Sequence, residues 1–147
     1  MKKLFFAAVV MLLGFSAFAQ NTSALLNDYI KVKDALVNGD GKAATQAINT
    51  LHQSLKNEVS FAQKDALLKA TDKLSKAGTI EKQRATFNDV STTMWQLVKK
   101  SGKPDQAVHY QYCPMKKAYW LSKEKEIKNP YYGTAMLNCG KVAETKE

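Results

Sequence analysis

The sequence predicts an all-α fold, an antiparallel bundle of about four helices on which a Cys/Met-rich, irregular C-terminal segment docks. Apolar residues recur at three- and four-residue steps through most of residues 23–100, the spacing of amphipathic helices. Glycine-containing breaks interrupt this pattern around residues 38–41, at Gly78 and at residues 101–104. Helices joined by links this short are typical of an antiparallel bundle.

Each predicted helix has its own boundary signals. The first covers residues 23–38, and Asp40 is the expected N-cap of the second, which continues to about Leu55. The third covers about residues 61–77. Thr79 is the expected cap of a long fourth helix that ends at Lys100.

The sequence pattern changes after Pro104. Residues 108–113 alternate between apolar and polar side chains, which predicts a short extended segment. Residues 119–121 form an aromatic anchor, and residues 123–128 are expected to form a short helix that ends before Asn129-Pro130. Residues 143–147 are interpreted as a frayed tail.

The N-terminus has the pattern of a secretory signal peptide. Two lysines precede an apolar run, and a small-x-small cleavage site ends at Ala19. We therefore expect residues 1–19 to be removed, leaving a single domain over residues 20–147 with a metal-site segment at 104–142. The expected location is the periplasm, with no stable membrane insertion after cleavage, since the apolar run is too short for a membrane span.

Charge and motifs exclude several functions. The formal net charge is +9, two units of which come from Lys2 and Lys3, and the remaining lysines are scattered. A solvated surface is the simpler interpretation, so no nucleic-acid partner is predicted. No zinc-protease, nucleophile-elbow, C-x-x-C or haem-attachment motif occurs, so we do not expect an enzyme.

Two short stretches carry the candidate metal ligands, Cys113, Met115, Met136 and Cys139. Both cysteines lie two or three positions from a methionine. Thiolate and thioether sulfur favour Cu(I) over hard ions, so these four side chains predict one soft-metal site, with Ag(I) or zinc as alternative ions. C-x-M in an extended segment places both side chains on one face, and M-x-x-C does so on a helical turn.

Two histidines and a disulfide complete the set of candidates. His109 lies on the same face of the extended segment as Cys113, and His52 lies on the second helix. Either is a further candidate ligand, although a hydrogen-bonded surface histidine is the simpler interpretation of His109. Export also favours a Cys113–Cys139 disulfide, worth about 3–4 kcal/mol by the loop-entropy model. The sequence leaves the redox state of the pair open.

The C-terminal motifs resemble a bacterial family of unknown function. They are Tyr112-Cys113-Pro114-Met115, Trp120-Leu121-Ser122-Lys123-Glu124, residues 126–133, Met136-Leu137 and Cys139-Gly140. The helix with Arg84, Phe87, Ser91 and Met94 is also similar. That family occurs as small exported proteins and as a C-terminal extension of periplasmic adaptor subunits of copper/silver efflux pumps.

The resemblance implies a helical bundle followed by a Cys/Met motif, in proteins linked to heavy-metal handling. Together with the residues, it predicts a periplasmic Cu(I)-binding protein that sequesters copper or transfers it to an efflux system. The expected partner is a heavy-metal efflux adaptor or another envelope protein. The alternative is a non-metal interaction module whose C-terminal segment is held by the Cys113–Cys139 disulfide.

Overall fold

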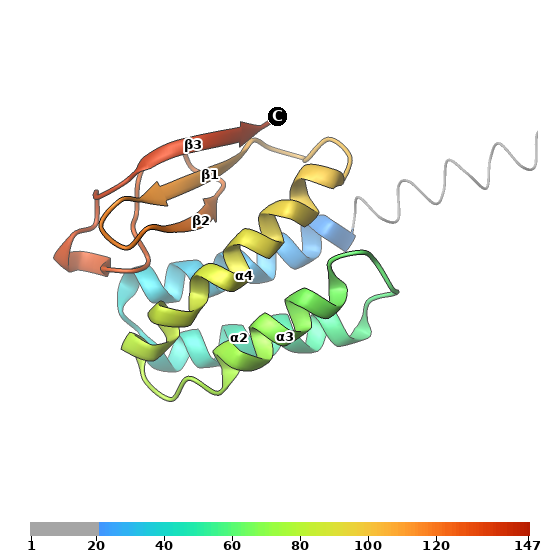
Figure 1. Cartoon of the computed structure of the whole chain (residues 1–147), viewed down its shortest axis with the longest axis horizontal. Coiled ribbons are helices and arrows are strands. Elements are labelled where there is room, and N and C mark those ends of the chain that lie inside the picture. The colour runs from blue at the N-terminus through green and yellow to red at the C-terminus, as the bar shows by residue number, and fades with distance from the viewer. Residues whose placement is uncertain (1–20) are drawn as a thin grey trace, which may run out of the picture.

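The computed structural model describes residues 21–147, and its N-terminal part is the predicted bundle. Its helices cover residues 21–38, α2 (Gly41–Asn57), α3 (Lys64–Ser75) and α4 (Ile80–Lys100). Successive helices run in opposite directions and are joined by short links (Figure 1). The prediction of four antiparallel helices is confirmed, although α3 is shorter at both ends than expected.

The two predicted helix caps are present. The Asp40 side chain accepts a hydrogen bond from the Ala43 N–H at 2.9 Å. The Thr79 hydroxyl accepts one from the Lys82 N–H at 3.3 Å. Each cap satisfies a backbone donor that has no partner within its own helix, which fixes where α2 and α4 begin.

An apolar core joins the helices to the C-terminal third of the chain. The rings of Tyr29, in the first helix, and Phe87, in α4, stack with centroids 5.2 Å apart. Trp95, in α4, stacks on Tyr110, in the C-terminal third, with ring centroids 4.8 Å apart. The C-terminal third therefore shares one core with the bundle, as the predicted docking requires.

The C-terminal third contains a small antiparallel sheet, so the fold is mostly helical but not all-α as predicted. Strands β1 (Val108–Cys113), β2 (Ala118–Ser122) and β3 (Lys141–Lys146) pair antiparallel in the order β2-β1-β3. The expected extended segment at residues 108–113 is confirmed as β1. The aromatic anchor at residues 119–121 lies within β2.

The edge of the sheet at β2 is covered by the helices. The Tyr119 N–H donates to the Asn88 side-chain oxygen at 2.8 Å, and the Leu121 N–H donates to the Tyr29 hydroxyl at 3.0 Å. These amides point away from β1 and would otherwise be open donors on an edge strand. Figure 1 shows the sheet against the layer that contains α4, on the side opposite α2 and α3.

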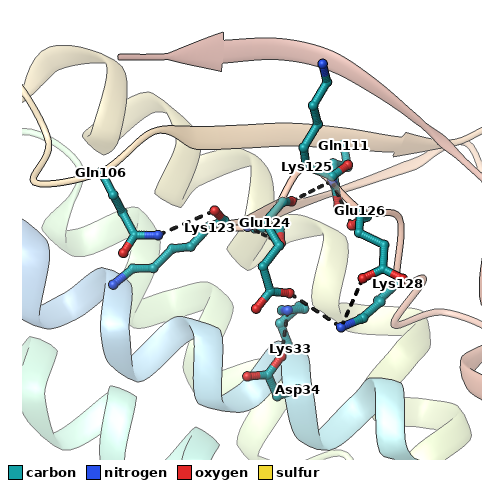
Figure 2. A network of polar contacts seen from close by, with 10 residues as sticks. Lys33, Asp34, Gln106, Gln111, Lys123, Glu124, Lys125, Glu126 and Lys128 are labelled. Atoms are coloured by element: carbon teal, nitrogen blue, oxygen red, sulfur yellow. Dashed lines mark hydrogen bonds and ion pairs between the residues drawn. The ribbon is translucent and has the colours of Figure 1, made fainter.

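Two further local predictions are wrong. Residues 123–126 form bends and residues 127–128 have no regular structure, so the predicted short helix is absent. The Gln111 side-chain amide donates to the carbonyls of Glu124, Lys125 and Glu126 at 3.1–3.3 Å (Figure 2). These carbonyls therefore bind a side chain of β1 instead of a helical N–H. Residues 143–147 are not a frayed tail, since most of them belong to β3.

The predicted signal peptide, residues 1–19, lies outside the described residues. Within residues 21–147 no helix is both long enough and apolar enough to cross a bilayer.

Candidate soft-metal site

The structure brings the two cysteines together. Tyr112 pairs with Lys141 across β1 and β3, so the residues that precede Lys141 run alongside the end of β1. Both thiols are free, and they lie close enough for Cys113 to influence the pKa of Cys139. Cys113 is fully buried and Cys139 is half-buried. The two cysteine-bearing stretches therefore lie at one end of the sheet, and the four-sulfur metal site predicted from the sequence stays a prediction.

The environment of Cys139 favours its neutral thiol. Partial removal from solvent, the neighbouring Cys113 charge and the hydrogen bond to Cys113 all raise the pKa of Cys139 above its usual value. A thiolate is the nucleophile and metal ligand, so this environment does not favour a reactive cysteine. A bound cation would reverse the balance, because it stabilises adjacent thiolates that otherwise repel each other.

The two methionines are exposed near this pair. Met115 is 64% exposed and Met136 is 38% exposed, which is unusual for large apolar side chains. The prediction that Cys113 and Met115 share one face of an extended segment is wrong, because β1 ends at Cys113 and residues 114–117 form the turn to β2. The turn predicted for M-x-x-C is present, since the Cys139 N–H donates to the Met136 carbonyl at 3.1 Å.

The histidines have other partners. The His52 Nδ1 lies 3.0 Å from the Thr71 hydroxyl, between α2 and α3. The His109 Nδ1 lies 3.0 Å from the Thr145 hydroxyl, on β3. Four residues of strand separate His109 from Cys113 by about 13 Å. Within residues 21–147, no three His, Cys, Asp or Glu side chains are grouped closely enough to hold a metal ion.

Asn129 holds the segment that carries Cys139. It is completely buried, and its side-chain NH₂ donates to the Cys139 carbonyl at 2.7 Å. Its side-chain oxygen accepts from the Tyr131 N–H at 2.8 Å, and its backbone N–H donates to the Leu137 carbonyl at 2.8 Å. From the sequence, Asn129 is expected only to mark the end of a helix. Asn-Pro is nevertheless a turn signal with a side chain suited to such local bonds.

Arg84 ties this segment to the bundle. Its Nε donates to the Pro130 carbonyl at 3.0 Å, and its Nη2 donates to the Leu36 carbonyl at the end of the first helix at 2.7 Å. Gly133 has φ +56°, and a Cβ there would lie 2.6 Å from the Arg84 Nη2. Glycine at this position therefore permits both the left-handed turn and the approach of the guanidinium.

Aromatic side chains enclose the inner side of the pair. Gly140 follows Cys139, and a Cβ on it would lie 2.8 Å from the Trp120 ring and 2.9 Å from the Tyr112 carbonyl. Tyr131 packs edge-on against Trp120, with centroids 6.2 Å apart. Burial is the main cause that raises the pKa of Tyr131, and the nearby Cys113 also raises it. The buried thiol therefore faces aromatic walls, while Cys139 lies nearer to solvent.

The fold and the paired thiols thus describe a small helical-bundle protein with an appended sheet and a two-cysteine site. Residues 25–106 match the family described as "Protein of unknown function (DUF3347)". The chain belongs to this family, which confirms the suspected membership. The match covers the helices and ends before β1, so it does not include the cysteines. No curated protein and no solved structure matches the chain.

Proposed function

We propose that this protein binds one soft monovalent ion, Cu(I), between Cys113 and Cys139, and acts in the periplasm in copper sequestration or transfer to an efflux system. The observation that supports this most directly is the proximity of the two free thiols at one end of the sheet. Two thiolates give a two-coordinate soft ion the ligands it prefers. Zinc usually takes four ligands in a structural site, which makes it the less suitable ion.

Copper uptake is coupled to the loss of protons from the two thiols. Cys113 and Cys139 would each release a proton as they bind, so apparent affinity should rise with pH by up to about two log units per pH unit. Asn129 and Arg84 bind no ion in this proposal. Asn129 fixes the segment that carries Cys139 and Arg84 ties that segment to the helices, so little chain ordering remains to be done on binding.

The exposed methionines have a different role from the cysteines. Thioethers carry no charge, so Met115 and Met136 would complete the shell weakly and keep the ion exchangeable. Their solvent exposure favours contact with an incoming or outgoing ion. His109 and His52 are not part of the proposed site, because both are hydrogen-bonded elsewhere.

A titration of the reduced protein with Cu(I), read by native mass spectrometry without oxygen, tests the proposal. One copper per chain is expected, and either Cys113→Ser or Cys139→Ser should abolish tight uptake. Replacing both Met115 and Met136 by Leu should weaken uptake less. Met94→Leu is the matched control, since Met94 is buried in α4 and its replacement should leave uptake unchanged.

The same proximity of the thiols also supports the second candidate, a non-metal interaction module held by a Cys113–Cys139 disulfide. An exported protein with adjacent cysteines meets the conditions for such a bond. The titration separates the two candidates. A mass lower by two hydrogens, with no copper uptake after full reduction, would support the disulfide module and contradict the copper proposal.

A further inference from the structure

The thiol pair lies at a distinct end of the molecule, which we call the sulfur end and define as residues 113–117 and 133–141. These residues include the β1–β2 turn, the short helix η1 (Gly133–Ala135) and the start of β3, and Figure 1 shows them at the same end of the sheet. Among residues 21–147, the exposed large apolar side chains are Val59, Met115 and Met136. The sulfur end therefore holds both of the exposed methionines.

Exposure at the sulfur end follows a gradient. Met115 is 64% exposed, Met136 is 38% exposed, Cys139 is half-buried and Cys113 is completely buried. The neutral thioethers thus lie outermost and the thiols, which bind as anions, lie innermost. An ion arriving from solvent can therefore reach the weakly binding thioethers more readily than the buried Cys113 thiol.

The charge of the sulfur end is of one sign. It carries Lys116, Lys117 and Lys141, all exposed, and contains no Asp or Glu. Beside it is a pocket of about 160 Å³ lined by Glu81, Arg84, Ala85, Lys116 and Tyr131. Arg84 already donates to two backbone carbonyls, so Lys116 is the cation that this pocket offers to an acidic side chain.

We propose that the sulfur end is the docking surface for an acidic, methionine-bearing protein that delivers Cu(I) to the thiol pair. This inference rests on the proposed function. The lysines attract the carboxylates of the partner, and the partner's thioethers hold the ion until Met115 and Met136 take it over.

Delivery is a ligand exchange without a redox step. Bonds from copper to the partner's thioether sulfurs break, and bonds to the sulfurs of Cys113 and Cys139 form. The two thiol protons leave to solvent, and copper remains Cu(I) throughout. Thiolates bind the ion more strongly than thioethers, which drives the exchange toward this protein.

The test uses a synthetic peptide of aspartates and methionines loaded with Cu(I), and a counterpart in which every aspartate is replaced by lysine. The rate of copper uptake by the reduced full chain is measured at low and at physiological salt. Uptake from the acidic peptide should be at least about 10-fold faster than from the basic peptide at low salt, and the difference should shrink as salt rises.

Charge reversal identifies the surface. Lys116→Glu, Lys117→Glu and Lys141→Glu together should remove the preference for the acidic peptide. The matched control reverses Lys56, Lys69 and Lys103, which change the net charge equally but lie on the helices and the loop after α4. This control should keep most of the preference.

Parallel measurements keep the two proposals distinguishable. Uptake from a Cu(I)–acetonitrile complex reports the thiol site alone, and its failure would contradict the proposed function. Normal uptake from that complex, with equal rates from both peptides, would overturn the docking proposal only. Sedimentation with phosphatidylglycerol vesicles tests whether the sulfur end binds a membrane instead. Vesicle binding that is lost on charge reversal, with no preference for the acidic peptide, would also overturn the docking proposal.

Discussion

Asn129 should hold Cys139 in position, and its removal should both destabilise the protein and expose the thiol. In Asn129→Ala the Cys139 carbonyl loses its donor at 2.7 Å and the Tyr131 N–H loses its acceptor at 2.8 Å. Each bond contributes about 1 kcal/mol net, and a buried group left unpaired costs about 1–3 kcal/mol. The free energy of unfolding should therefore fall by about 2–4 kcal/mol.

Urea denaturation of the reduced protein measures this loss, and the rate of alkylation of Cys139 measures the exposure of the thiol. Asn129→Asp keeps the acceptor for Tyr131 but places a carboxylate oxygen against the Cys139 carbonyl, so it should also accelerate alkylation. Asn138→Ala is the matched control, because Asn138 is exposed in the same turn. A loss below about 1 kcal/mol in Asn129→Ala, with alkylation at the wild-type rate, would refute the assigned role.

Three further results are expected. Tyr29→Phe should lower the free energy of unfolding, measured by urea denaturation, by about 2–3 kcal/mol, because the buried Leu121 N–H loses its acceptor at 3.0 Å. A change within error of zero would contradict the role of this hydroxyl at the sheet edge. Gly140→Ala should lower the free energy of unfolding by at least about 1–3 kcal/mol, because the added Cβ would lie 2.8 Å from the Trp120 ring. Near-UV circular dichroism should detect the displaced indole. An unchanged spectrum together with unchanged stability would contradict this packing. The pKa of Cys139 is raised in the folded state, so folding favours the neutral thiol. The resulting contribution to the free energy of unfolding is fully present below the ordinary thiol pKa of 9.0, and it is lost as the pH rises through the pKa of the folded state. Urea denaturation of the reduced protein between neutral and alkaline pH should therefore show a decline in stability that is smaller in Cys139→Ser, and equal declines would contradict the shift.

The helical part of the fold was predictable because its signals are local. Three- and four-residue periodicity marks each helix, and the caps Asp40 and Thr79 act on amides three residues away. Such information lies within one turn of the chain, so it can be read without knowing the tertiary structure.

The sheet was missed because its signals are not local. β3 is mostly exposed and mostly polar, so nothing in its sequence distinguishes it from a tail until it pairs with β1. The expected helix at residues 123–128 fails for a related reason. Gln111 binds the carbonyls of that segment from more than ten residues away, and tertiary contacts of this kind override local propensity.

The convergence of the cysteines was predicted, whereas the supports of the site were not. The prediction depended on sulfur donors repeating in two short stretches. The pairing of Tyr112 with Lys141 brings these stretches together. The roles of Asn129 and Arg84 depend on carbonyl groups that only the folded chain places beside them. The Asn-Pro turn signal marked Asn129 as a turn residue but not as a support of Cys139, and the residue type of Arg84 gave no such indication.

X-ray absorption at the copper edge tests the central claim most directly. The sample is the reduced protein loaded anaerobically with one equivalent of Cu(I). The account predicts monovalent copper whose nearest neighbours are all sulfur, with the signal lost in Cys113→Ser and in Cys139→Ser. Copper bound mainly through nitrogen or oxygen, or a sulfur shell that survives both substitutions, would contradict it.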